Sequence, residues 1–496
     1  MKFRTKFSLC PLMNPPTRRE CALVLALLLG ILYFSNARIH TNLVPTPLSP
    51  PSSHPSQLST LQGTTPQLYN TRLTWGDNQV PQTKVLANVP GWSIIDRLYI
   101  FKGVVYVVSD DPDSVPDVEN MYSKGVEIFP GKEAEDTRLP GDEDIRIIST
   151  TEAKALFGTG ASVIDGVTFF VNDHPQFIRH YYHWSAELYF GFWRTYSSLD
   201  PTIPLDGNTT LPQPRHMFFN RLDAFRWRDP TNMNQLVLRS SFPEVTMEFR
   251  DDWDDRIKMG VPFVLDRVVL ADRSAAMRAY NFQRYQRTAS VPFALPGSVN
   301  WWMAIRNNVV QFAGMDLNDG SSTTATPVIT YISRQAWGRR TLLQADHERL
   351  VKELYRLRDK HGWEVNVVLM EKLSRAEQIR LAVRTTIMMG VHGNGLTSLI
   401  WMRPTPRTTV IEFFYPGGFA HDYEYTARSL GIAHYGFWGD SFVLQHPESL
   451  RRSFTSPNMP LNTYPEGFQG NSIPVDAAAV GRLCYDRLTL SLEVDD

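Results

Sequence analysis

The strongest constraint on the fold is a regular alternation of strand-like and helix-like segments between residues 327 and 414. Short apolar runs of the length of buried strands are separated by leucines at helical spacing and by a Ser374–Glu377 capping box, which opens a helix through Val383. The expected strands are residues 328–332, 365–368, 386–391 and 409–414, and the expected helices lie within 342–357, 374–383 and 396–401. This alternation predicts a parallel, Rossmann-like sheet with a ligand at the carboxyl ends of its strands.

Two of these strand ends carry residues suited to binding a diphosphate. The strand at 328–332 runs into a loop with Arg334, Arg339 and Arg340, and guanidinium groups grip phosphate oxygens in two-pronged fashion. The strand at 386–391 runs into a glycine-rich turn whose amides can form an anion site. This turn consists of His392, Gly393, Asn394, Gly395, Leu396 and Thr397. The alternatives are a solvated arginine loop and a tight turn with a satisfied histidine.

A second constellation lies upstream, where His180, His183 and Glu187 share one face if the segment is helical. A histidine and a carboxylate one turn apart can form and tune a general base. A zinc site would need another ligand, and a pair of acids for glycoside hydrolysis would need a second carboxylate. A helix of the aromatic core with satisfied histidines is the remaining alternative.

Two acidic clusters imitate the Asp-x-Asp motif of metal-dependent sugar transfer. They span residues 111–113 and 251–255, and neither follows a convincing apolar strand. We expect both to be solvated loops and therefore expect no metal site.

The N-terminus predicts a membrane anchor followed by a stem. Basic residues precede an apolar run that begins at Cys21, and the orientation rule then places the N-terminus in the cytoplasm. The run is short, so a signal peptide cleaved near Ala37 is the alternative. Residues 38–75 are rich in Pro, Ser and Thr, as in linkers. Asn208 begins an Asn-Thr-Thr sequon and is a candidate glycosylation site.

Composition indicates the number of domains and argues against some classes of partner and cross-link. A chain of 496 residues with 43% hydrophobic side chains suits two domains, and its net charge of −1 gives no argument for nucleic-acid binding. Of the three cysteines, Cys10 and Cys21 lie in or beside the apolar segment, so the globular part has only Cys484 and cannot form an internal disulfide.

The C-terminal half resembles glycosyltransferase family 61. The resemblance rests on motifs that occur in order between residues 327 and 431, with a further match at Tyr182 to Glu187. These motifs are Ser333-Arg334, Arg339-Arg340, Glu377-Gln378-Ile379, the Gly390 to Thr397 turn and Ile411-Glu412. Asn394 stands where alanine is common, and Glu187 where animal members have Asp.

The resemblance implies an inverting α/β enzyme of GT-B type, in which two Rossmann-like domains face each other across a cleft. The C-terminal domain would hold a UDP-sugar through the arginines and the turn, with His392 on phosphate or sugar and Glu412 on ribose or uracil. Either His183 or Glu187 would deprotonate the acceptor, and we favour Glu187 orienting His183. No metal or other cofactor is expected.

We therefore expect a glycosyltransferase that moves xylose or another UDP-activated sugar to a glycan or glycoprotein. The protein would be a single-pass, type II protein of the Golgi or ER membrane, with its catalytic part in the lumen. The alternative is a non-catalytic, membrane-tethered protein that binds nucleotide sugar or glycan. The expected divisions are a tail (1–20), an anchor (21–37), a stem (38–75), an acceptor-side domain (76–300) and a donor-side domain (301–496).

Overall fold

The structure is a computed structural model that describes residues 71–129, 135–317, 326–416, 418–444 and 471–490. All described residues belong to one compact unit, residues 69–496. The predicted tail and anchor, and the stem up to residue 70, lie outside the described residues. In the ranges that the structure describes, no helix is both long and apolar enough to cross a membrane.

The N-terminal half is built on a nine-stranded sheet whose main path runs β5-β4-β3-β9-β6-β7-β8, with β1 beside β6 and β2 beside β3. Its strands are β1 (Arg72–Thr74), β2 (Lys84–Val89), β3 (Trp92–Phe101), β4 (Val104–Val108), β5 (Ile145–Ile148), β6 (Gly160–Val171), β7 (His216–Phe219), β8 (Thr246–Glu248) and β9 (Phe263–Ala271). This sheet is mixed, because β3 pairs antiparallel with β4 and β9, while β9, β6, β7 and β8 are parallel.

The mixed sheet corrects the expectation of a second Rossmann-like sheet. The physical reason is the two-residue turn between β3 and β4, where Lys102 and Gly103 both have positive φ, 51° and 84°. Such a turn closes a hairpin, and a hairpin is antiparallel. The sequence of residues 98–108 predicts this hairpin, because two strand-like apolar runs are joined at Lys102 and Gly103.

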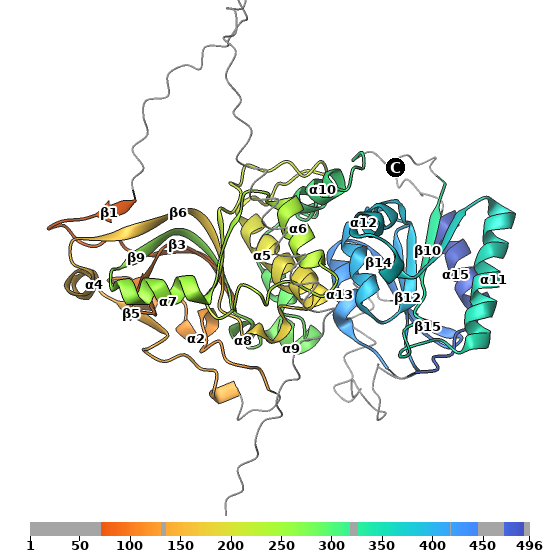
Figure 1. Cartoon of the computed structure of the whole chain (residues 1–496), viewed down its shortest axis with the longest axis horizontal. Helices are drawn as coiled ribbons and strands as arrows, with labels where there is room; N and C mark the ends of the chain where they lie inside the picture. The colour runs from red at the N-terminus through yellow and green to blue at the C-terminus, as the bar shows by residue number, and fades with distance from the viewer. Residues whose placement is uncertain (1–70, 130–134, 318–325, 417, 445–470, 491–496) are drawn as a thin grey trace, which may run out of the picture. The chain divides into compact units, whose positions relative to one another are not determined.

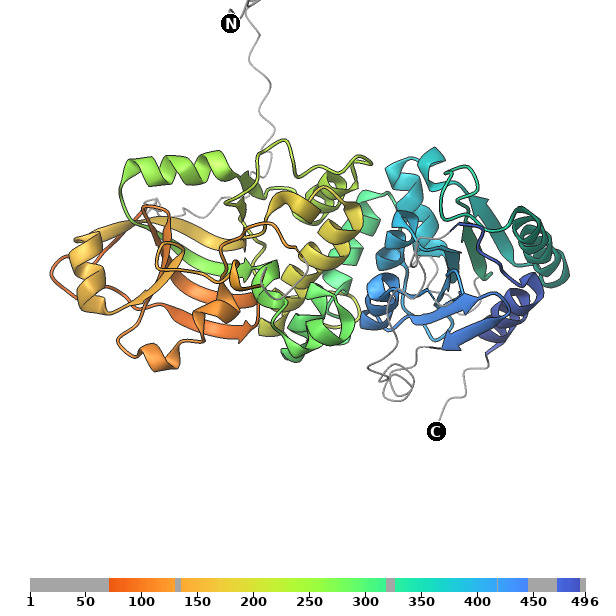
Figure 2. The ribbon, with the colours of Figure 1, turned by 90° about the horizontal axis from the view of Figure 1, so that it is seen from below.

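The helices of this half gather mainly on the side of the sheet that faces the C-terminal half (Figures 1 and 2). Among the described residues, those of four residues or more are α2 (Val118–Met121), α4 (Thr150–Phe157), η3 (His183–Tyr189), α5 (Phe190–Tyr196), α6 (Met233–Ser241), α7 (Arg250–Met259), α8 (Arg273–Ala276), α9 (Tyr280–Tyr285), η5 (Thr288–Ala294) and α10 (Met303–Phe312). α2, α4 and α7 are exceptions. α4 and α7 cover the far part of the sheet, and α2 packs in the same hydrophobic cluster as α7.

The C-terminal half holds a six-stranded sheet in the order β11-β10-β12-β13-β14-β15. The first five strands are parallel, and only the edge strand β15 is antiparallel. The strands are β10 (Val328–Ile332), β11 (Glu364–Val368), β12 (Ile387–Val391), β13 (Thr409–Phe413), β14 (Ala433–Trp438) and β15 (Ser441–Leu444). The expected parallel sheet is confirmed, and its four predicted strands match within one residue.

Helices cover both faces of this sheet. α11 (Gln344–His361) and α15 (Ala477–Thr489) pack on one face, while α12 (Arg375–Arg384), η7 (Asn394–Trp401) and α13 (His421–Ser429) cover the face toward the N-terminal half (Figure 1). The capping box at Ser374 is present. Chain order reverses between β10 and β12. In open α/β sheets, the loops after the strands diverge at such a switch point and a ligand binds there, and we call this position the crevice.

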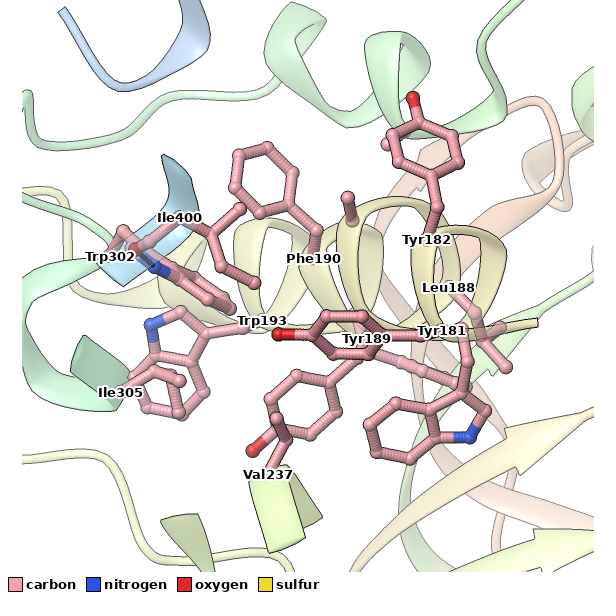
Figure 3. Packing of buried hydrophobic residues seen from close by; sticks show 14 of the residues in the cluster. Tyr181, Tyr182, Leu188, Tyr189, Phe190, Trp193, Val237, Trp302, Ile305 and Ile400 are labelled. Carbon is pink, nitrogen blue, oxygen red and sulfur yellow. Dashed lines mark hydrogen bonds between the residues drawn. The ribbon is translucent and has the colours of Figure 1, made fainter. Parts of the chain in front are cut away.

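One hydrophobic core is continuous between the two sheets. Residues of η3, α5, α6 and α10 pack with residues of α12, η7 and α13 in a single cluster. Figure 3 shows its aromatic centre, where the Trp302 indole donates a 2.9 Å hydrogen bond to the Ile400 carbonyl. The division predicted between residues 300 and 301 falls inside this core, beside Trp301. α10 therefore packs against both halves.

Candidate active site

The first part of the candidate site lies in the crevice between the loops after β10 and β12. Ile332 pairs with Gly390 in the register of these strands, so Arg334 and Gly393 leave neighbouring positions at one sheet edge. A Cβ added at Gly393 would stand 2.3 Å from Nη1 of Arg334. A side chain at position 393 would therefore displace this guanidinium from its present position.

The arginines of this crevice have buried nitrogen atoms without a protein acceptor. Nε and Nη2 of Arg334 and Nε of Arg340 are buried and find no hydrogen-bond partner among the described residues. Burial and the neighbouring charge of Arg340 lower the pKa of Arg334 to about 10. Buried donors of this kind are normally satisfied, so their arrangement fits an anionic ligand. Arg339, predicted with them, is exposed.

The turn after β12 supplies backbone amides rather than side chains. Its helix η7 makes its first hydrogen bond from the Leu396 amide to the Gly393 carbonyl, at 2.9 Å, so the amides of Asn394 and Gly395 precede the helical ladder. The side chains of Leu396 and Thr397 are buried, and Thr397 Oγ1 donates to Asn394 Oδ1 at 3.3 Å. Asn394 thus has an intramolecular role in the turn.

His392 belongs to a buried cluster with Glu412 and His434. Glu412 lies on β13, and its two oxygens contact His392 Nδ1 at 2.6 Å and His434 Nε2 at 2.9 Å. Glu412 is fully buried, which does not fit the direct contact with ribose or uracil expected from the sequence. We therefore assign it the orientation of His392.

The strand register explains how this cluster fits inside the sheet. Glu412 pairs with Gly390 on β12 and with Gly436 on β14, so glycines flank it on both sides. His392 follows Gly390 by two residues and His434 precedes Gly436 by two, which places both imidazoles on the face of Glu412. Burial raises the pKa of Glu412 to about 7 and lowers that of His392 to about 4.

The second part of the site is the pair of His183 and Glu187 on η3. The predicted helix is a π-helix in this segment, a rare form that is frequent at functional sites. His183 Nδ1 lies 2.5 Å from Glu187 Oε2. The carboxylate is 6% exposed and the imidazole 25% exposed, so the histidine is the partner that reaches solvent.

Positive neighbours keep Glu187 ionised. Burial by itself would raise its pKa, but His183, Arg287 and Arg273 outweigh burial and lower the pKa to about 2. Arg287 Nη1 lies 3.7 Å from Glu187 Oε1 and 3.0 Å from Asp422 Oδ1 on α13. One guanidinium therefore joins the upstream pair to the C-terminal half.

The two parts of the site meet through aromatic contacts. The Tyr182 ring lies 5.1 Å from that of Tyr423, which lies 5.2 Å from His392. The Tyr182 hydroxyl also donates to the Asp422 carbonyl at 2.9 Å. The structure thus brings the two predicted constellations together.

Sequence reasoning missed Arg287, Asp422 and His434. Arg287 and Asp422 carry no local signal, since their meeting depends on the packing of α13 beside η3. His434 did carry one, because a histidine between apolar residues of a strand is a buried polar group that requires a partner.

The remaining predicted features lie away from this region or outside catalysis. Residues 251–255 form part of α7 rather than a loop, because Asp252 caps the start of that helix, and residues 111–113 begin a 3-10 turn at the surface. In the described part of the chain, no group of three or more His, Cys, Asp or Glu is placed to hold a metal ion. Asn208 is exposed in the loop before β7.

Comparison with known proteins gives a family match over the site. The family model described as Glycosyltransferase 61 matches residues 181–411. The matched stretch begins two residues before His183, includes the arginine loop and the His392 turn, and ends one residue before Glu412. A search among curated proteins finds no match.

Proposed function

As the chain belongs to the glycosyltransferase 61 family and is a glycosyltransferase, we propose that it transfers the sugar of a UDP-sugar to a glycan or glycoprotein hydroxyl with inversion. The observation that carries this proposal is that buried guanidinium nitrogens of Arg334 and Arg340, beside the Gly393 turn, have no hydrogen-bond partner in the part of the chain that the structure describes. Charge-assisted hydrogen bonds to a diphosphate would satisfy them.

On the donor side, these arginines stabilise the charge that develops on the departing diphosphate. Arg334 and Arg340 act as fixed cations, and the amides of Asn394 and Gly395 add donors at the start of η7. Arg339 is exposed at the same loop and adds long-range attraction. In this proposal no metal ion takes part.

On the acceptor side, His183 is the general base. Its Nδ1 is held by the buried Glu187, and its more exposed imidazole is able to meet an acceptor hydroxyl. Glu187 stays ionised and balances the imidazolium that forms, the task of the carboxylate in other His–carboxylate pairs. Glu187 is therefore a positioning residue.

The reaction is a single in-line displacement. The acceptor hydroxyl loses its proton to His183 Nε2 while its oxygen forms a bond to the anomeric carbon. The bond from that carbon to the β-phosphate oxygen breaks, its electron pair leaves with UDP, and the configuration inverts. Xylose or another pentose is our candidate sugar.

The proposed setting is the lumen of the Golgi or ER. Supporting features of the sequence are the basic flank before residue 21, the apolar run at 21–37 as a type II anchor, and the stem at 38–75. The exposed position of Asn208 suits N-glycosylation there. Residues 76–300 would hold the acceptor and residues 301–496 the donor, in a variant of the GT-B arrangement whose N-terminal sheet is mixed.

A donor screen tests the proposal. The purified full chain is incubated with a panel of UDP-sugars and EDTA, UDP release is recorded, and UDP binding is titrated in parallel. We expect UDP to bind and one sugar donor to give release that EDTA does not suppress. Absence of both UDP binding and release would contradict the donor site, and release that EDTA abolishes would contradict the metal-free mechanism.

A further inference from the structure

The cluster of His392, Glu412 and His434 has a property that the transfer mechanism does not use. Each oxygen of Glu412 is bonded to an imidazole nitrogen, and the three side chains are 6%, 0% and 1% exposed. When both histidines are neutral and donate their N–H groups to Glu412, the cluster carries one negative charge inside the protein. Nδ1 of His434 is also buried without a partner among the described residues, so the cluster has an unused proton acceptor.

Burial and the charges of the crevice together determine the proton affinity of this cluster. Burial lowers the pKa of His392 most, Asp422 opposes this, and Arg340, Arg287 and Arg334 lower the pKa further. Tyr423 of α13 packs against the imidazole, and Glu424 of the same helix helps burial to raise the pKa of Glu412. Arg340 and Glu412 also attract each other, so this arginine partly compensates the negative charge of the cluster in the absence of ligand.

A bound diphosphate would reverse this balance. Its oxygens would pair with the guanidinium groups of Arg334 and Arg340, which cancels their field at His392. The buried negative cluster would then lie beside further negative charge in a region from which water is excluded. One added proton removes that conflict at the lowest cost, because it turns the cluster from anionic to neutral.

We propose that the His392–Glu412–His434 cluster takes up a proton from solvent when a nucleotide diphosphate binds in the crevice, so that donor binding and protonation are coupled. This inference rests on the proposed function of the crevice. The proton is shared within the cluster and remains there while UDP is bound. His392 supplies the positive end toward the ligand, and Glu412 and His434 are positioning residues.

Calorimetry of UDP binding to the full chain tests the coupling. Titrations at pH 8 are run in buffers of different ionisation enthalpy, since each proton taken from the buffer adds that buffer's enthalpy to the measured heat. UDP is fully ionised at this pH because its second phosphate pKa is about 6. The pKa of Glu412 near 7 means that the cluster lacks the added proton before binding. We expect a positive slope of about 0.5 to 1 proton for each UDP bound.

Two variants locate the proton. Glu412→Gln keeps the shape of the side chain but removes the charge, and should bring the slope close to zero. His421→Asn removes the histidine of the other buried His–Glu pair, His421 with Glu424 on α13, and should leave the slope unchanged. Equal slopes in the wild type and in Glu412→Gln would overturn the assignment to this cluster.

The wild-type protein alone also decides the question, in case Glu412→Gln does not fold. Proton uptake requires the UDP Kd to rise between pH 7.5 and 8.5, by up to about tenfold for one proton. UDP binding with neither a buffer-dependent heat nor a rise in Kd would overturn the coupling while leaving the donor site intact. No UDP binding in any buffer would overturn the donor site and the coupling together.

Discussion

The two His–Glu pairs of the site contain the same type of contact but lie in different surroundings. In both, a histidine Nδ1 meets a glutamate oxygen, at 2.5 Å for His183–Glu187 and at 2.6 Å for His392–Glu412. His183, together with Arg287 and Arg273, outweighs burial and lowers the pKa of Glu187 to about 2, whereas burial raises the pKa of Glu412 to about 7. The same His–Glu contact is therefore combined with arginines at Glu187 and with dominant burial at Glu412.

This difference suits the two ends of the proposed reaction. A carboxylate that stays ionised supports a histidine that must gain a proton from the acceptor during the displacement. A carboxylate near its midpoint at neutral pH lets the cluster change its charge when a diphosphate arrives. A His–Glu pair therefore abstracts a proton on the acceptor side of the proposed reaction, and another balances charge on the donor side.

The largest expected effect comes from His183→Ala. Removing the base should lower kcat by about 100-fold to 10,000-fold, while the UDP Kd stays within twofold. The measurement is UDP release with the donor found in the screen, alongside a UDP titration. His180→Ala is the matched control, because its ring lies 4.9 Å from that of His183 but is not bonded to Glu187. Wild-type turnover in His183→Ala would exclude this residue as the base.

The next effect is on stability, and the two glutamates should respond to pH in opposite directions. Glu187 has a lowered pKa, so its stabilisation is present above the unfolded value of about 4.3 and is lost as the pH falls toward 2. Glu187→Gln should therefore cost about 3 kcal/mol near pH 7, and less below pH 4. Urea unfolding at several pH values measures this.

Glu412 has a raised pKa, so the unfolded chain releases this proton near pH 4.3 while the folded protein holds it until about pH 7. The folded state therefore loses stability over that window. Glu412→Gln lacks this loss, and its stability relative to the wild type should rise between pH 4.5 and 7. If the unfolding free energies of Glu187→Gln and Glu412→Gln, each relative to the wild type, changed with pH in the same direction, the two His–Glu pairs would not differ as described.

The sequence pattern predicts the C-terminal sheet well and the N-terminal sheet poorly, and the difference has a physical reason. β10, β12 and β13 are buried on both faces, so each is a nearly continuous apolar run that is recognisable without context. In the N-terminal sheet, β9 joins β3 and β6 although it lies about a hundred residues after β6. No local pattern reports such a pairing, and the hairpin at Lys102 is the one part that a turn signal revealed.

The candidate site can be divided in the same way. The sequence singles out His183, Glu187, Arg334 and His392 as candidates because each follows a strand end or lies at helical spacing in a recognisable motif. The π-helical form of η3 and the bridge from Arg287 to Asp422 arise from tertiary packing. Glu412 was noticed but given another role, since a glutamate in a strand does not reveal that two histidines occupy its oxygens.

A smaller effect is expected from variants that disturb the close contact between Arg334 and Gly393 in the donor crevice. Arg334→Ala should weaken UDP binding by about tenfold to 100-fold, the value of a charged hydrogen bond. Gly393→Ala should act in the same direction while keeping every charge, because the new Cβ would displace Nη1 of Arg334. Arg349→Ala, an exposed arginine on α11 that pairs with Asp346, is the control and should leave the UDP Kd unchanged. A UDP titration of the three variants measures this, and full affinity in Gly393→Ala would show that the contact is dispensable.

The smallest effect concerns the contact that joins the two regions. Tyr182→Phe removes the hydroxyl that donates to the Asp422 carbonyl and should lower the unfolding free energy by about 1 kcal/mol. Urea denaturation measures the loss. Tyr106→Phe, in the N-terminal sheet, is a suitable comparison. A loss no larger than that of the comparison variant would show that this hydrogen bond contributes nothing to the junction.

The most direct test compares Glu187→Gln with Glu412→Gln in one experiment that records kcat and the UDP Kd at pH 7.5 and 8.5. We expect Glu187→Gln to lose turnover while its UDP Kd still rises with pH. Glu412→Gln lacks the buried negative charge, so we expect it to bind UDP at least as tightly as the wild type, with a Kd that no longer rises with pH. If both variants lost the same property, turnover or the pH dependence of the Kd, the two His–Glu pairs would not divide the reaction between acceptor and leaving group.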